Sequence, residues 1–292
     1  MWMTDTTATP IFMHKEKSTV KKFYEKASLR EWKRLVKDPF HRLEFDTTLY
    51  FLKKYLPKKG LILDAGGGPG RYTIYLAKSG YDMVLLDYTP ALLEIAKRQI
   101  SRQGIKSKVK EVTEGSITNL SQFKDNTFDA VICLGGPLSH VEGEENREIA
   151  VSELKRVAKK GVPIFLSVMG KFGVVIDASM YYHDEIAMTK HFEDLWMRGE
   201  DYMFGGSAGN GTRSYCHFFE PSELDSLVER SGIEIIDRVG LEGFGSHSQK
   251  GINLLYKKPQ AWKNWMKLHY SMCNHPISYA TSGHILLIGK KV

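Results

Sequence analysis

A glycine-rich turn near residue 65 constrains the fold of this 292-residue chain more than any other feature. Residues 61–70 read Leu-Ile-Leu-Asp-Ala-Gly-Gly-Gly-Pro-Gly, a helical stretch follows over 71–79, and a second apolar run, 83–86, ends on Asp87. This order of strand, glycine turn, helix, strand and acid is typical of the first half of a nucleotide-binding α/β unit. Glycines let the backbone approach a ligand closely. A carboxylate at the tip of the second strand can accept hydrogen bonds from both hydroxyls of a ribose.

The spacing of the glycines distinguishes between classes of nucleotide. Gly66 and Gly68 fit the dinucleotide pattern Gly-x-Gly-x-x-Gly, but Arg71 occupies its third glycine position, so the pattern fails by one residue. The chain reads instead Asp64-x-Gly66-x-Gly68-x-Gly70, which resembles motif I of the class I S-adenosylmethionine (SAM) methyltransferases. The resemblance implies that the strand-end acid and the glycine loop hold the methionine end of SAM, which is therefore the expected cofactor.

The resemblance also implies where the rest of the cofactor binds. Asp87 is expected at the ribose, and Tyr88 beside it can flank the adenine. Ser116 stands where many family members have an acid that accepts a hydrogen bond from the adenine amino group. The segment from Leu134 matches the one that lies along the methionine portion. Arg71 has two open readings, a contact with the SAM carboxylate or simply a helix start. The predicted cofactor-binding residues are Tyr24, Asp64, Gly66, Gly68, Gly70, Asp87, Tyr88, Ser116, Ile117, Leu134 and Gly135.

The N-terminal region is predicted to precede the sheet as helices. Residues 1–17 read as a polar extension, and residues 18–57 as a helical cap that Pro39 interrupts. In methyltransferases of this type a helix before motif I often covers the bound SAM. Tyr24 resembles the tyrosine that such lids present to the cofactor, and a core aromatic on an amphipathic helix is the alternative interpretation.

Apolar runs and amphipathic stretches alternate through the rest of the chain, which predicts an α/β fold with a Rossmann-like doubly wound sheet. The resemblance implies seven strands in the order 3-2-1-4-5-7-6, with the last strand antiparallel. We expect residues 18–292 to form a single SAM-binding domain. The predicted strands cover residues 61–64, 83–87, 109–112, 128–133, 162–168, 233–239 and 284–288.

Two long stretches interrupt this alternation, at residues 170–219 and 241–282. Connections of this length are uncommon in a compact domain unless they are functional. The first is rich in Met and aromatic residues and follows the fifth strand, whose carboxyl end faces the reaction centre of such folds. We interpret it as a lid that builds the acceptor pocket. An added subdomain or the surface of a homodimer is the alternative.

Composition narrows the partners and the compartment. The chain is 42% hydrophobic and 26% charged, which is ordinary for a globular protein. No apolar stretch approaches the roughly 20 residues that span a bilayer, so we expect no membrane partner. The three cysteines are far apart and indicate neither a disulfide framework nor a metal site. A cytoplasmic location follows. The formal charge of +7 comes from scattered lysines, which favours solvated helix faces over nucleic-acid binding.

Two histidines are candidate catalytic bases. The sulfonium of SAM already activates its methyl group, so the protein must align the acceptor and, for an oxygen or nitrogen acceptor, remove a proton. Histidine suits this task because its pKa lies near neutrality. His140 follows the fourth strand, and His217 lies where the first long stretch rejoins the core. A structural role is the alternative for each, and a thiol or amine acceptor can react without a base.

The sequence therefore predicts SAM-dependent methyl transfer to a small-molecule acceptor with an O, N or S nucleophile, by in-line displacement. The large apolar insertion and the lack of a separate basic module favour this function. Strand four is followed by Leu-Gly-Gly-Pro, unlike the Asn/Asp-Pro-Pro-aromatic motif of amino-methylating enzymes. An RNA or protein methyltransferase is one alternative. A non-catalytic SAM-binding regulator is another, because motif I reports binding rather than turnover.

Overall fold

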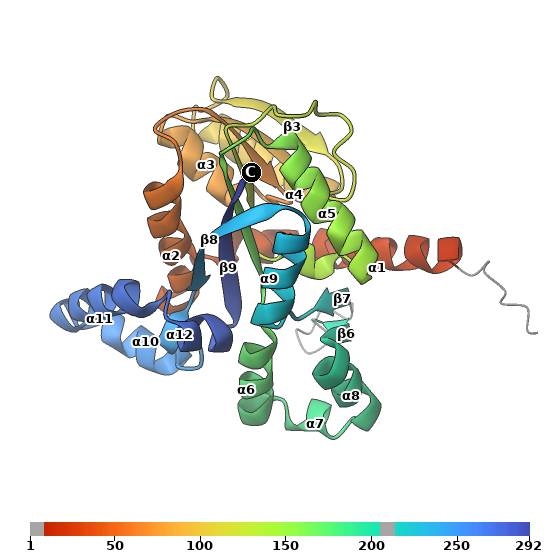
Figure 1. Cartoon of the computed structure of the whole chain (residues 1–292). Coiled ribbons are helices and arrows are strands. Elements are labelled where there is room, and N and C mark those ends of the chain that lie inside the picture. The colour runs from red at the N-terminus through yellow and green to blue at the C-terminus, as the bar shows by residue number, and fades with distance from the viewer. Residues whose placement is uncertain (1–8, 205–213) are drawn as a thin grey trace, which may run out of the picture.

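A seven-stranded sheet organises the molecule, as the computed structural model of residues 9–204 and 214–292 shows (Figure 1). Its order, β3-β2-β1-β4-β5-β9-β8, is the predicted one, since β8 and β9 are the sixth and seventh strands of the expected core. β9 is antiparallel to both neighbours and the other pairs are parallel, which confirms the prediction for the last strand. The strands are β1 (Leu61–Ala65), β2 (Asp82–Asp87), β3 (Val109–Glu114), β4 (Ala130–Cys133), β5 (Pro163–Met169), β8 (Ile233–Gly240) and β9 (His284–Lys291).

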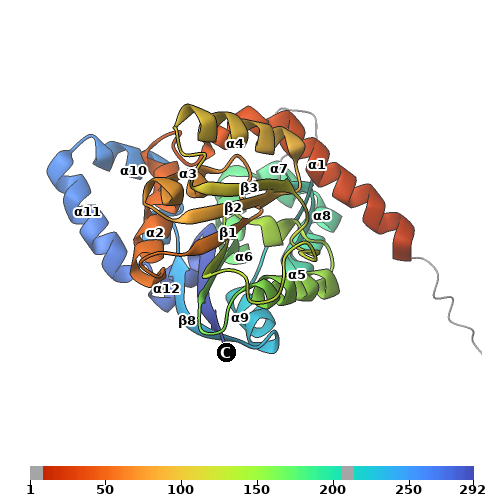
Figure 2. The ribbon, with the colours of Figure 1, turned by 90° about the horizontal axis from the view of Figure 1, so that it is seen from above.

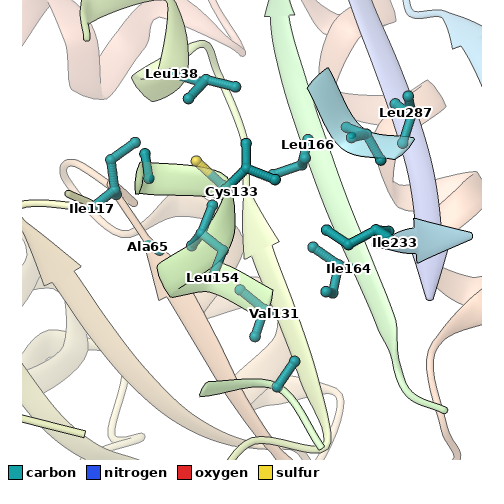
Figure 3. Packing of buried hydrophobic residues seen from close by; sticks show 14 of the residues in the cluster. Ala65, Ile117, Val131, Cys133, Leu138, Leu154, Ile164, Leu166, Ile233 and Leu287 are labelled. Atoms are coloured by element: carbon teal, nitrogen blue, oxygen red, sulfur yellow. The ribbon is translucent and has the colours of Figure 1, made fainter. Parts of the chain in front are cut away.

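One face of the sheet packs against α5 (Glu144–Val157) and α9 (Pro221–Arg230). The apolar stripe of α5 faces inward because its residues recur every three to four positions. Figure 3 shows Leu154 from this stripe beside Val131 and Cys133 of β4. All three side chains are fully buried. Strands β4 and β5 are buried along both faces, which explains their continuous apolar sequence.

The other face is covered by α2 (Pro39–Tyr55), α3 (Arg71–Lys78) and α4 (Pro90–Arg102), as the view from above shows (Figure 2). A proline occupies the first turn of α2 and of α4, where its missing N–H costs no hydrogen bond. Asp38 caps α2 by accepting a hydrogen bond from the backbone N–H of His41.

Helix α1 (Thr9–Arg34) differs from the predicted cap. It begins inside the stretch interpreted as a polar extension, whose residues 1–8 lie outside the described part of the chain. The part of the predicted cap that precedes Pro39 belongs to this one helix. It packs against α4 and against β7 (Ser214–His217), so it lies across the carboxyl ends of the first strands.

The two long stretches contain secondary structure of their own. Residues 170–219 form α6 (Lys171–Tyr181), α7 (His183–Ile186), α8 (Thr189–Arg198) and an antiparallel pair of strands, β6 (Glu200–Phe204) and β7. The four glycines between residues 205 and 211 lie outside the described residues. Residues 241–282 form α10 (Gln249–Tyr256), α11 (Pro259–Met272) and α12 (Pro276–Thr281) after a single 3-10 turn, η3 (Gly243–Gly245). Across the described residues, no helix has the length and apolar character that crossing a membrane requires.

Candidate functional site

A cavity of about 180 Å³ lies where β1 to β4 end. Its wall is built from the segments that follow these strands and from two covering elements, α1 and β7. Most of the predicted site residues line it. From the predicted set the lining includes Tyr24, Gly66, Gly68, Asp87, Tyr88, Ser116, Ile117, Leu134, Gly135 and His140. Asp64, Gly70 and His217 are not part of the lining.

The glycine loop is held in place by backbone hydrogen bonds. The N–H of Gly66 donates to the carbonyl of Leu86 at 2.7 Å, which ties the loop to the end of β2. Gly66 adopts φ 75°, and a Cβ there would press on the ring of Pro137. Only glycine therefore allows the loop to pack so closely against the 3-10 turn η1 (Pro137–His140).

Asp87 joins the loop to the next strand. Its Oδ2 accepts the N–H of Gly68 and its Oδ1 accepts the N–H of Thr89, each at 2.8 Å. An ionised carboxylate can accept about four hydrogen bonds, so each oxygen keeps capacity toward the cavity. Burial raises the pKa of Asp87 to about 6, despite the two backbone bonds that oppose this shift.

Asp64 lies behind the loop rather than in the cavity wall. The side chain is fully buried, and its Oδ2 accepts a hydrogen bond from the hydroxyl of Thr73 at 2.6 Å. A Cβ on Gly67 would collide with this carboxyl group. Burial raises the pKa of Asp64 to about 7. Gly70 lies deeper still, at the start of α3 and against Ala96. Both residues therefore support the loop from behind.

Tyr24 and His140 meet at the cavity wall. The Tyr24 hydroxyl lies 2.7 Å from Nε2 of His140, and Nδ1 of His140 lies 2.8 Å from the backbone carbonyl of Tyr215 on β7. A carbonyl only accepts, so Nδ1 carries the proton of the neutral ring and Nε2 accepts from Tyr24. Burial lowers the pKa of His140 and raises that of Tyr24 well above its usual value. The neutral forms of both are therefore favoured.

His217 occupies a different place. Its side chain is buried between two carboxylates, with Nε2 at 2.6 Å from Glu223 and Nδ1 at 3.2 Å from Glu200. Burial by itself lowers the pKa of His217, but the bonds to Glu200 and Glu223 outweigh it and raise the pKa. Arg147 adds a second cation, 3.7 Å from Glu200. The structure does not bring His217 to the cavity, and this geometry favours a structural role.

Helix α1 is tied across the cavity by polar contacts. Lys21 pairs with Glu114 at 2.7 Å and lies over the ring of Tyr88, 5.2 Å from its centroid. Arg71, at the start of α3, stacks on Trp32 of α1 at 3.9 Å and donates to the carbonyl of that residue. Arg71 also lines the cavity, and its buried Nε has no hydrogen-bond partner among the described residues.

A charged cluster lies beside the cavity. Arg34 of α1 lines the cavity and donates to both carboxylate oxygens of Glu44. Nδ1 of His284 is 2.7 Å from Glu242 and 3.9 Å from Glu44. Glu44, Glu242 and His284 are close enough to ligate one metal ion, but these groups already form ion pairs with one another and with Arg34. Arg34 also pairs with Glu31 at 2.8 Å, so the cluster joins two cations to three carboxylates.

Sequence reasoning missed several residues of the cavity wall. Glu31, Arg34, Asn146 and Tyr215 line it from two helices and a short strand. None belongs to a local motif, and their approach depends on how α1, α5 and β7 pack. The sequence offered one signal for the residues on α1. Tyr24, which was predicted to contact the cofactor, identified the face of this helix that points at the cavity.

Comparisons with known proteins agree with this architecture. Residues 62–161 match the sequence model of the family described as methyltransferase domain. A ubiquinone biosynthesis O-methyltransferase of Rickettsia bellii (strain OSU 85-389) is 27% identical over 180 residues, 62% of this chain and 64% of the relative. The match therefore spans less than two thirds of that relative. A putative methyltransferase of Encephalitozoon cuniculi (strain GB-M1) is 27% identical over 222 residues, 76% of this chain and 90% of the relative.

A solved structure shows the same fold. The crystal structure of a SAM-dependent methyltransferase from Methanosarcina mazei aligns with a TM-score of 0.57 at 20% identity. The alignment covers 83% of this chain and 97% of that one.

Proposed function

We propose that this chain, a SAM-dependent methyltransferase of class I, methylates a small-molecule acceptor with an oxygen, nitrogen or sulfur nucleophile. One observation carries the proposal: the cavity beside the glycine loop and Asp87 also contains the Tyr24–His140 pair. When bound, SAM supplies a methyl group on a sulfonium, which an acceptor attacks in line with the departing sulfur. The side chains of the protein must bind SAM, orient the acceptor and, where needed, remove its proton.

The cavity wall fits SAM. Asp87 has acceptor capacity left for the two ribose hydroxyls, and Tyr88 lies beside it to flank the adenine. Ser116 and Ile117 form the wall beyond Tyr88. The Ser116 hydroxyl already bonds that of Thr118 at 2.7 Å, so the adenine edge would meet a pair of hydroxyls there. Leu134 and Gly135 would lie along the methionine portion.

Arg71 is the residue that we assign to the carboxylate of SAM. It faces the cavity, and stacking on Trp32 fixes its guanidinium plane. Its buried Nε has no partner in the described part of the chain, and a buried donor without an acceptor costs free energy. A carboxylate would satisfy it through a charge-assisted hydrogen bond.

His140 is the residue that we assign to proton removal from an acceptor. The Tyr215 carbonyl holds the proton on Nδ1, which leaves Nε2 as the basic atom facing the cavity. The low pKa of the buried ring keeps it unprotonated near neutral pH. An acceptor hydroxyl that replaced the Tyr24 hydroxyl at Nε2 could pass its proton there.

Access to the cavity supports a small acceptor. Helix α1 and strand β7 close over it, and the contacts of Lys21 and Tyr24 tie α1 to the opposite wall. Strand β7 belongs to residues 170–219 and supplies Tyr215, so we interpret this stretch as the acceptor-side insertion. A polymer would need α1 displaced before any of its atoms reached His140.

Two measurements on the purified chain test the proposal. Calorimetric titration should give micromolar binding of SAM and S-adenosylhomocysteine, no binding of NAD, and loss of binding in Asp87→Ala. Release of S-adenosylhomocysteine should then rise with a member of a panel of small phenols, amines and thiols, and not with RNA or protein substrates. If SAM and S-adenosylhomocysteine bind but no small acceptor is methylated, the enzymatic proposal is overturned and a non-catalytic SAM-binding regulator is favoured. Turnover on RNA or protein alone would overturn the acceptor class.

A further inference from the structure

The helices α10 and α11 form a hairpin with an unusual charge. Residues 243–292 contain no aspartate and no glutamate. The hairpin, residues 249–272, carries positive charge from lysines alone: Lys250, Lys257, Lys258, Lys263 and Lys267. We call this segment the basic hairpin. Its charge is therefore uncompensated along its whole length.

The lysines of the basic hairpin are solvated. All five are exposed, and none pairs with a carboxylate within residues 9–204 and 214–292. Some lysines elsewhere are paired, such as Lys97 with Glu94 on α4 and Lys110 with Asp82 on β2. The basic hairpin differs in carrying five lysines with no acidic residue in the same segment. Unpaired lysines on one structural unit create a positive local potential that attracts an anionic partner.

Apolar side chains are exposed among these lysines. Leu254 is 52% exposed and lines a shallow depression together with Lys250 and Lys257. Such an arrangement leaves an aliphatic side chain in water between two cations. A partner that offers only negative charge would not cover it.

A second apolar feature lies on α11. Leu268, 50% exposed, and Phe244, 47% exposed, border a groove that Trp265 and Met272 complete. The indole N–H of Trp265 is buried and lacks an acceptor among the described residues. Lys267 directly precedes Leu268 and is exposed, but it is not among the residues that line this groove.

The basic hairpin lies apart from the cavity. Figures 1 and 2 both place α11 at one margin of the molecule, with the N-terminal half of α1 at the opposite margin. The hairpin packs on α2 and on η3, and the residues of the cavity wall include none from α10 or α11. A partner could bind the hairpin without entering the cavity.

We propose that the basic hairpin docks this chain on the surface of an anionic lipid bilayer. Lysines would contact lipid phosphates, while Leu254, Leu268 and Phe244 would enter the boundary between headgroups and acyl chains. The exposed Leu254 and Leu268 favour a bilayer over RNA, because an aliphatic side chain gains by entering an acyl-chain boundary and offers no ring on which a base could stack. The exposed rings of Phe244 and Tyr256 would suit either partner, so the leucines carry the distinction. The proposal revises the expectation of no membrane partner and does not rest on the proposed function.

Co-sedimentation with vesicles tests the docking surface. We expect the purified chain to bind vesicles of phosphatidylcholine mixed with phosphatidylglycerol, and to bind pure phosphatidylcholine vesicles at least about a hundredfold more weakly. Each lysine near an anionic surface contributes about fivefold in affinity. The variant Lys257→Gln/Lys258→Gln/Lys263→Gln/Lys267→Gln should therefore lose about a hundredfold or more. Leu254→Ser/Leu268→Ser keeps every charge and should lose about tenfold.

A matched variant separates the surface from the net charge. Lys22→Gln/Lys26→Gln/Lys106→Gln/Lys124→Gln removes the same four charges from exposed positions elsewhere and should bind vesicles like the unmodified chain. Melting curves and S-adenosylhomocysteine titrations show whether each variant is folded. Absent vesicle binding, or equal losses in the two lysine variants, would overturn the proposal. So would RNA binding that needs the hairpin lysines while the leucine variant behaves normally.

Discussion

The hydroxyl of Tyr24 lies 2.7 Å from Nε2 of His140, although 116 residues separate the two in the chain. This contact joins α1 to the segment after β4, directly over the cavity. In the proposed reaction this nitrogen takes the proton of the acceptor. On that proposal Tyr24 occupies the position of an acceptor hydroxyl, and an acceptor that displaced it would meet a base already in the required tautomer.

Replacing His140 should affect turnover more than cofactor binding. In His140→Gln we expect kcat for an oxygen acceptor to fall by roughly 10²–10⁴-fold, the usual contribution of a general base. The affinity for S-adenosylhomocysteine should change little. Tyr24→Phe removes the hydroxyl that an acceptor must displace and keeps the base, so its kcat should stay within about threefold of the unmodified chain. Steady-state kinetics and calorimetry check both variants, and an unchanged kcat in His140→Gln would exclude His140 as the base.

Replacing His217 should have the opposite profile. The ring is held by Glu200 and Glu223 away from the cavity, so His217→Gln should lower the free energy of unfolding by about 2 kcal/mol. Its kcat at a temperature where it stays folded should remain within about threefold of the unmodified chain. Urea unfolding curves and kcat, measured on the same sample of His217→Gln, test these two expectations. A kcat loss as large as that of His140→Gln would restore His217 as a catalytic candidate.

Cofactor affinity should decline in mildly acidic solution. Burial raises the pKa of Asp87 to about 6, and the ionised carboxylate is the form that accepts hydrogen bonds from a ribose. Below pH 6 we therefore expect the affinity for S-adenosylhomocysteine to fall by up to about tenfold per pH unit. Titrations between pH 5 and pH 8 measure this. Asp87→Asn should bind weakly with a flatter profile.

Asp64 provides the control for that experiment. Its pKa is raised to about 7, so it titrates nearby, but it lies behind the glycine loop. Asp64→Asn should retain the decline below pH 6 if Asp87 causes it. If the decline in affinity below pH 6 disappears in Asp64→Asn and persists in Asp87→Asn, the pH dependence comes from Asp64 behind the glycine loop.

The sheet could be predicted from sequence because its signals are local. The run Leu61–Leu63, the glycine turn and Asp87 specify two strands and the turn between them without any tertiary information. The middle of each of the five central strands is apolar because both faces of the sheet are covered there. The start of α1 was missed although Pro10 is a typical first-turn residue, because residues 9–17 contain only one short apolar patch, 11–13, and no helical repeat of apolar positions.

The site could be predicted where a motif carries it or where a residue lies soon after the end of a strand, as His140 does. Asp87 and Gly68 follow the family pattern, and the structure places both at the cavity. Asp64 belongs to the same pattern, yet its side chain lies behind the glycine loop. The alternation of residues along β1 does not show how the loop that follows folds back over Asp64. Tyr215 and Arg34 belong to no motif. They reach the cavity only through the packing of β7 and α1, which sequence periodicity does not encode.

Arg71 should recognise the carboxylate of the cofactor. We expect Arg71→Gln to weaken S-adenosylhomocysteine binding by about tenfold, the effect of losing one charge-assisted hydrogen bond. Methylthioadenosine lacks the amino-acid carboxylate, so the same variant should bind it as tightly as the unmodified chain. Calorimetric titration with the two ligands gives the comparison. Equal losses for both would mean that Arg71 acts only through its stack on Trp32.

Stability should decrease in alkaline solution because of His284. Burial alone would lower its pKa, but the carboxylates of Glu44 and Glu242 raise it to about 9, above the value of about 6.5 in an unfolded chain. Its contribution is therefore complete below about pH 6.5 and is lost as the pH rises through about 9. Urea unfolding should give about 2 kcal/mol less at pH 9 than at pH 6.5. His284→Gln should have a lower free energy of unfolding at pH 6.5 and should lose less of it between pH 6.5 and pH 9. If this variant shows the same loss as the unmodified chain, the pH dependence comes from His217 and His247, whose pKa values are also raised.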